Sequence, residues 1–177
     1  MGLKNVFIEP WQIGKSTYAA STASVTVDAT GAGDVLVIIP STQKAIAIHR
    51  IEVSGTATAA AVINCSVVTR SSLDTGGVNS ILTSTPLNMA STASPTGVLV
   101  YTTNPTSGTL VGTVASKKLL VSTVATQPEI CVFDFNMLVG FSPVISPATP
   151  TNCIAVSFGG AAMAGNSFAF TVTWSDF

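Results

Sequence analysis

Phe168-Ala-Phe-Thr-Val-Thr-Trp-Ser175 is the stretch of sequence that decides the fold class. Its large apolar side chains fall on every second residue, and Ala, Thr and Ser fall between them. Successive side chains of a strand point to opposite faces of the sheet. The alternation therefore predicts a strand with an aromatic face in the core and a small, polar face outside. Trp174 is assigned to the core by the same alternation.

A period of two recurs along most of the chain, and no segment has a convincing helical period of 3.6 residues. A change of phase near His49-Arg50, within the apolar set between Ile46 and Val53, indicates a β-bulge. Clusters of Gly, Pro, Asn, Ser and Thr separate the strand-like segments. We therefore predict an all-β fold, a jelly-roll or Greek-key β-sandwich with an extended N-terminal arm. The strands are expected over residues 34–39, 46–53, 62–68, 98–102, 110–114, 129–135, 153–158 and 168–175.

The first 22 residues differ from the rest of the chain. They carry much aromatic and apolar area in a pattern too irregular for a pair of strands. One interpretation is an edge strand that packs on the domain's own core; the other is an arm that docks onto a neighbouring subunit, where Trp and Tyr are favoured anchors. We divide the chain into an arm, residues 1–22, and a β-sandwich domain, residues 23–177. Phe7, Trp11 and Tyr18 are the expected interface residues of the arm.

Charged residues are scarce. The chain has 7 basic and 8 acidic residues, which together make up 8% of its 177 positions and leave a net charge of −1. A soluble domain has about 25% charged residues, and a surface with few charges does little to oppose association. We therefore expect much of the surface to lie against other protein. The dispersed basic residues predict no nucleic-acid partner, and the absence of a run of about 20 apolar residues predicts no membrane partner.

The three cysteines are widely spaced and lie in apolar or alternating segments. Free cysteine in such a setting behaves as a small buried hydrophobe, which is the interpretation we favour for Cys65, Cys131 and Cys153. A disulfide between Cys131 and Cys153 is the alternative, although a reducing place of synthesis argues against it.

Asp74-Thr75-Gly76 matches the triplet of aspartic proteases, but that chemistry requires two carboxylates that share one proton. A single triplet followed by Gly77 is better explained as a tight turn. His49, the only histidine, adjoins Arg50, whose charge opposes a bound metal, and no Gly-x-Ser-x-Gly is present. We expect no enzymatic activity, no catalytic residue, no cofactor and no metal. A hydrolase or a sugar-binding module is the weaker alternative.

Three parts of the sequence carry a likeness to a known family: residues 46–77, the Tyr101-Thr-Thr-Asn-Pro-Thr-Ser-Gly-Thr109 segment, and the closing Phe-Thr-Val-Thr-Trp-Ser-Asp. Over residues 45–177 the chain resembles the small jelly-roll structural proteins of tailed-bacteriophage virions, which include capsid cement or decoration proteins. The shared features are turn and strand patterns, so the family offers no catalytic residues.

The resemblance implies a homotrimer on the capsid surface of a virion, made in the host cytoplasm. It also implies that the trimer stabilises the head by clamping adjacent subunits of the major capsid protein. Other virion proteins of this build are components of the tail, the baseplate or head fibres and take part in host-surface recognition. That location is the alternative.

Overall fold

A computed structural model gives the structure of the chain and describes residues 16–124, 129–135, 142–147 and 151–177. Within these ranges the chain forms twelve strands and no helix, which confirms the all-β prediction. The strands are β1 Ser16–Val25, β2 Ala32–Ile39, β3 Ile46–Thr56, β4 Ala61–Arg70, β5 Val78–Ile81, β6 Thr85–Pro86, β7 Gly97–Thr103, β8 Leu110–Val121, β9 Ile130–Asp134, β10 Val144–Ile145, β11 Cys153–Ala161 and β12 Ser167–Asp176.

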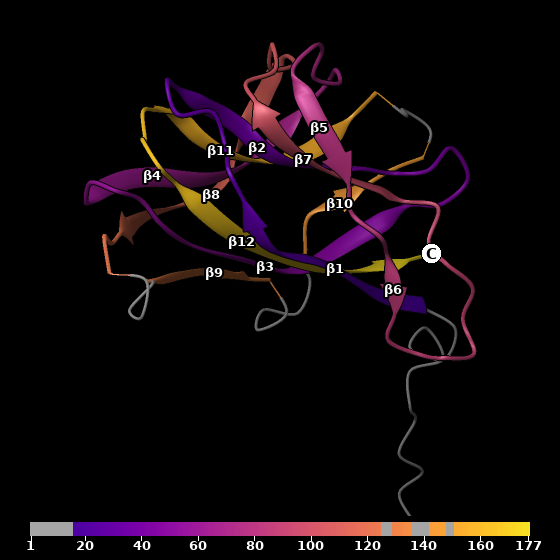
Figure 1. Cartoon of the computed structure of the whole chain (residues 1–177). Coiled ribbons are helices and arrows are strands. Elements are labelled where there is room, and N and C mark those ends of the chain that lie inside the picture. The colour runs from indigo at the N-terminus through magenta and orange to yellow at the C-terminus, as the bar shows by residue number, and fades with distance from the viewer. Residues whose placement is uncertain (1–15, 125–128, 136–141, 148–150) are drawn as a thin grey trace, which may run out of the picture.

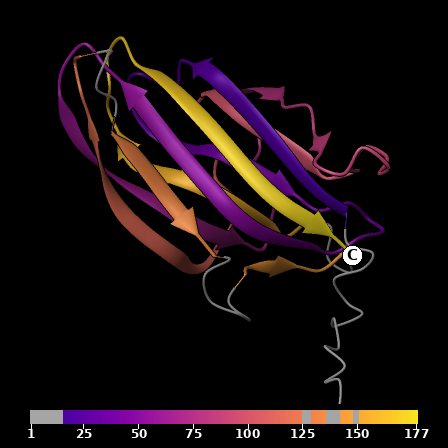
Figure 2. The ribbon, with the colours of Figure 1, turned by 90° about the horizontal axis from the view of Figure 1, so that it is seen from below.

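The strands form two antiparallel sheets that pack face to face as a sandwich (Figure 1). Sheet A has the order β10-β3-β12-β1-β6, and β9 also pairs with β3. Sheet B has the order β5-β7-β2-β11-β4-β8. Figure 2 looks onto sheet A, where the long strands β3, β12 and β1 run side by side.

The pairing is nested along the chain, as in an antiparallel ribbon rolled up on itself. β1 pairs with β12, β2 with β11, β3 with β9, and β4 with β8. The first four strands alternate between sheet A and sheet B, which is the arrangement of a jelly roll. The segment from β5 to β7 is inserted between β4 and β8. It extends sheet B beyond β2 and sheet A beyond β1, so it lies at the flank next to β1.

The core lies between the sheets, and β12 supplies its largest side chains. Phe168, Phe170 and Trp174 are buried, in agreement with the alternation of the sequence. Phe158 of β11 reaches them from the opposite sheet, with its ring centroid 4.9 Å from that of Phe168. The expected bulge in β3 is also present. Thr173 is opposite Arg50 while Trp174 is opposite Ile48, which leaves His49 as the extra residue.

One expectation for the N-terminal arm is corrected by the structure. Residues 16–22 belong to β1, and the Tyr18 side chain is only 1% exposed. Its ring stacks on that of Trp174 with a centroid separation of 5.8 Å. Tyr18 is therefore a core residue. Its ring is buried against Trp174 of the same sheet and is not available to a neighbouring subunit. Phe7 and Trp11, the other two expected interface residues, lie outside the described residues.

Candidate assembly interface

Buried ionisable groups meet on the outer face of sheet B, around Arg70 at the end of β4. The Arg70 guanidinium donates from Nη2 to Asp34 Oδ1 at 2.7 Å and from Nε to Asp34 Oδ2 at 2.9 Å. Its Nη1 donates to the Gly108 carbonyl oxygen at 3.1 Å. Asp34, on β2, is 1% exposed. This fork matches a carboxylate geometrically, and it ties β2, β4 and the segment before β8 together.

Asp74 completes this cluster from the turn that follows β4. The Gly108 N–H donates to Asp74 Oδ1 at 2.8 Å. Gly76 and Gly77 have φ values of 69° and 71°, so the turn uses the left-handed backbone region that glycine adopts without strain. The chain bends at Gly76 and Gly77, in agreement with the expected change of direction, while Thr75 forms an isolated bridge with Thr106.

The structure brings a second carboxyl, that of Asp34, close to Asp74, and nothing in the sequence pattern indicated this. Burial raises the pKa of Asp74 above its ordinary value, and the Asp34 carboxylate raises it further, while the Gly108 N–H and Arg70 act in the opposite direction. Both oxygens of Asp34 accept hydrogen bonds from Arg70. The cluster is best understood as an anchor for the loops at this end of sheet B.

We predict that Asp74→Asn stabilises the protein at neutral pH by about 1 kcal/mol or less, since water screens a half-buried group. The folded chain holds the Asp74 proton more tightly than the unfolded chain does. Wild-type stability from this group is therefore full below about pH 4 and is lost as the pH rises through the folded-state pKa. Asn keeps the oxygen that accepts the Gly108 N–H. Urea unfolding at several pH values measures the difference.

Asp28→Asn is the matched control for that prediction. Hydrogen bonds from Thr30 and from the Asn104 N–H lower the pKa of Asp28, so its contribution has the opposite sign. Asp28→Asn should lower stability at neutral pH and have no effect at pH values where the carboxyl is protonated in both states. A common sign for the two variants would contradict the account of Asp74.

The cysteines are free and buried, as expected. Cys65 on β4 contacts Cys131 on β9 within the main core, and this contact together with burial raises the pKa of the Cys65 thiol. Cys153 lies instead in a small apolar cluster on the outer face of sheet B, and burial raises the pKa of its thiol to about 12. Cys131 and Cys153 are thus on opposite sides of sheet B. The alternative of a disulfide between them is wrong.

Exposed apolar side chains gather at both ends of sheet B. β8, which is the end strand next to β4, presents the first surface, which we call the β8 edge and define by Leu110, Val111 and Val114. Leu110 and Val111 are 54% and 67% exposed, and Val111 and Val114 are the extra residues at two β-bulges in the pairing of β8 with β4. The first half of β8 is therefore both bulged and exposed. At the other end of sheet B, Val78 and Ile81 are exposed on β5; Leu87 and Met89, which follow β6 at the end of sheet A, are exposed as well.

The two halves of β8 differ in their contacts with neighbouring segments. In the second half, Lys117 Nζ donates to the Val132 carbonyl oxygen of β9, and the Leu120 N–H donates to Glu129 Oε2 at 2.6 Å. The first half has no charged residue. An exposed, apolar edge strand is a template on which another protein strand can pair, and the two β-bulges in this half of β8 limit the length of regular strand that it offers. The β8 edge is a candidate surface for assembly, and β8 is longer than β5, the four-residue strand at the other end of sheet B, which also lacks charge.

His49, the other candidate residue from the sequence, has a structural position. His49 lies at the bulge in β3, where its Nε2 is 2.6 Å from Ser175 Oγ. Within the described ranges, no group of three or more His, Cys, Asp or Glu side chains could hold a metal ion. Nor does any helix in those ranges have the length and apolar character needed to cross a membrane.

Comparison with known proteins gives no relative from which a function could be transferred. No protein-family model matches the chain, and no curated protein or solved structure matches it either.

Proposed function

We propose that this protein is a structural component of a tailed-bacteriophage virion: a cement or decoration protein that stabilises the head by binding across adjacent major capsid protein subunits as a homotrimer. The observation that carries the proposal is the β8 edge. It combines free backbone hydrogen-bonding groups with exposed apolar side chains, in a chain of which only 8% of residues are charged.

The jelly roll gives this edge a rigid support. β8 pairs with β4 over its whole length, and β4 pairs with β11 in the middle of sheet B. A capsid segment that adds to β8 would gain main-chain hydrogen bonds from the strand and apolar contacts from Leu110, Val111 and Val114. Each such contact is modest. A trimer that makes several contacts at once gains affinity through effective concentration, as a protein clamped across neighbouring subunits requires.

Electron cryo-microscopy of heads and tails incubated with the purified protein tests the proposal. Density for the sandwich on the head, between major capsid protein subunits and with the β8 edge facing them, is the expected result. Density confined to the tail, the baseplate or a head fibre would contradict the proposal and favour the alternative role in host-surface recognition. Absence from all of these surfaces would reject a role in the virion.

We predict that Val111→Lys lowers binding to heads by about tenfold or more, equivalent to at least about 1.4 kcal/mol. The substitution places a charge that must lose its water when the β8 edge is covered. The fold should be unaffected because Val111 is largely exposed. Val78→Lys is the matched control, since Val78 is 59% exposed on β5, at the opposite end of sheet B. Co-sedimentation of fluorescent protein with heads measures binding; equal affinities for both variants would exclude the β8 edge.

A further inference from the structure

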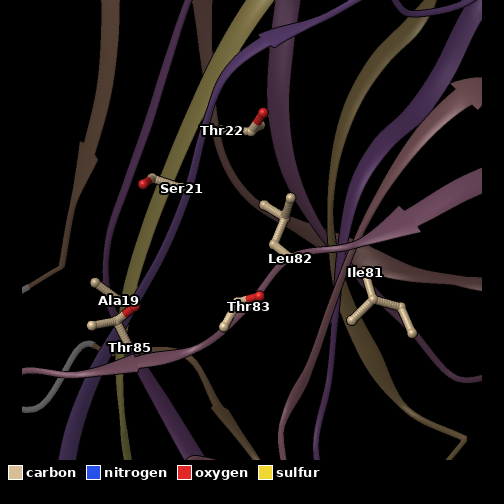
Figure 3. A pocket seen from close by; sticks show the side chains of 7 residues that line it. All are labelled: Ala19, Ser21, Thr22, Ile81, Leu82, Thr83 and Thr85. Atoms are coloured by element: carbon tan, nitrogen blue, oxygen red, sulfur yellow. The ribbon is translucent and has the colours of Figure 1, made fainter.

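An open groove lies at the flank of the sandwich between β1 and the inserted segment. Its volume is about 580 Å³, within the usual size of ligand clefts. The lining residues are mostly small or bear a hydroxyl, and none is charged: Ala19, Ser21, Thr22, Ile81, Leu82, Thr83 and Thr85. Figure 3 shows Ser21 and Thr22 on one wall, with Leu82 and Thr83 across from them.

The groove runs along the part of β1 where its outer edge is not covered by β6. β6 pairs with β1 at Tyr18 and Ala19, and the Leu87 N–H donates to the Thr17 carbonyl oxygen at 2.8 Å. A strand directs the backbone groups of alternate residues to the same side. Since those of Thr17 and Ala19 point toward β6, those of Ser21 point the same way, into the groove. No strand of the described residues pairs with Ser21 on this side.

We propose that this groove accepts an extended peptide as an added strand on β1, and that the peptide is the N-terminal segment, residues 3–9, of a second copy of this chain. Free backbone groups at Ser21 would give main-chain hydrogen bonds, and the small lining residues leave room for large side chains. The segment 3–9 contains Val6, Phe7 and Ile8, the β-branched and aromatic types that strands favour. Fifteen residues precede β1, and they can span up to about 50 Å.

The position of β6 argues for a second copy as the donor. The N-terminal segment leaves its own β1 at Ser16, and β6 covers the same edge of β1 directly beyond, at Tyr18 and Ala19. A segment that turned back on its own chain would meet β6 before it reached Ser21. A segment from another copy can enter the groove from the end near Val25, where β6 does not extend.

The exchange also bears on symmetry. The donated segment and the accepting groove are different surfaces, so the contact is heterologous, and such contacts form a ring when the rotation between copies closes. The inference rests on the proposed function only in taking the protein to be a homotrimer, and it does not involve the capsid.

Two single variants, each in the full chain, test the exchange. Ser21→Pro blocks the acceptor: Pro lacks an N–H, but the Ser21 N–H points away from β12, and proline is tolerated on edge strands in that orientation. Phe7→Asp blocks the donor and leaves the described sandwich unchanged. We expect wild type to have the mass of three chains, each variant alone that of one 18.0 kDa chain, and a mixture of the variants that of two chains. Sedimentation velocity measures these masses, and circular dichroism verifies folding.

The two-chain complex is specific to the proposal, because only an intact donor meeting an intact acceptor can form it. A wild-type protein of single-chain mass, variants that keep the wild-type mass, or a mixture that stays at single-chain mass would each overturn the inference. Hydrogen exchange at the Ser21 amide gives a second measurement that needs no substitution in β1. It should be slow in wild type and at least about tenfold faster in Phe7→Asp, and equal rates would contradict strand addition. Because no capsid is present, failure here leaves the test of head binding unaffected.

Discussion

Replacing Trp174 by Ala is expected to destabilise the sandwich by about 3–5 kcal/mol, the usual cost of truncating a buried aromatic residue. Trp174 is fully buried, and its ring stacks on Tyr18. The indole Nε1 also donates to Asp176 Oδ1 at 3.1 Å, so truncation removes a donor from a buried carboxylate. A domain of this size has about 5–15 kcal/mol of stability, so the loss should be a large part of the total.

Urea unfolding, followed by the backbone circular dichroism signal and not by tryptophan fluorescence, measures this loss of stability. Met89→Ala is the control, because Met89 is 98% exposed and should change stability by less than about 0.5 kcal/mol. Trp174→Phe should lie between the two, since it keeps much of the apolar area but not the N–H. A Trp174→Ala loss below about 1 kcal/mol would mean that β12 is not the centre of the core.

The sequence predicted the strands of the core better than those at the edges. β12 and β3 could be predicted because burial of the core face imposes a period of two on the sequence. β11 could be predicted as a short apolar run, because both of its faces are buried. The role of Tyr18 in β1 was predicted wrongly because an aromatic residue near the N-terminus is typical of a docking anchor. Its stacking partner, Trp174, is 156 positions away and could not be identified from the sequence. The second half of β8 was missed because Lys117 and Lys118 interrupt the apolar pattern. Both lysines lie on an edge strand, which has a neighbouring strand of its sheet on one side only, so charged side chains are tolerated there.

The sites depend still more on tertiary structure. The change of direction at Asp74-Thr75-Gly76-Gly77 could be predicted because the conformational preference of glycine is local. The approach of Asp34 to Arg70 could not be predicted, because it requires β2 and β4 to be placed on either side of β11. The groove beside Ser21 exists because the inserted segment first pairs with β1 at Ala19 and then continues toward Thr17, away from Ser21. Tertiary packing determines where the inserted segment runs along the sandwich, and a single sequence carries no pattern that predicts this position.

Arg70→Met is expected to cost about 3–5 kcal/mol, the second of the two large effects. Met retains much of the apolar stem of the side chain, but the Asp34 carboxylate would lose both hydrogen bonds of the fork while remaining buried on β2. The Gly108 carbonyl oxygen would lose a donor as well, which should loosen the segment before β8. Urea unfolding measures the loss of stability, and the exchange rates of the amides of residues 106–110 measure the loosening.

A double-mutant cycle with Asp34→Asn separates the ion pair from general disruption of the cluster. If the penalty in Arg70→Met comes mainly from an uncompensated carboxylate, adding Asp34→Asn should recover part of the stability. The double variant would then be more stable than the sum of the single losses indicates, with an interaction energy of about 1–3 kcal/mol. Additive losses would show that the fork contributes little beyond packing. Since the same cluster fixes the segment that leads into Leu110, a cycle with strong coupling would also connect this ion pair to the position of the β8 edge.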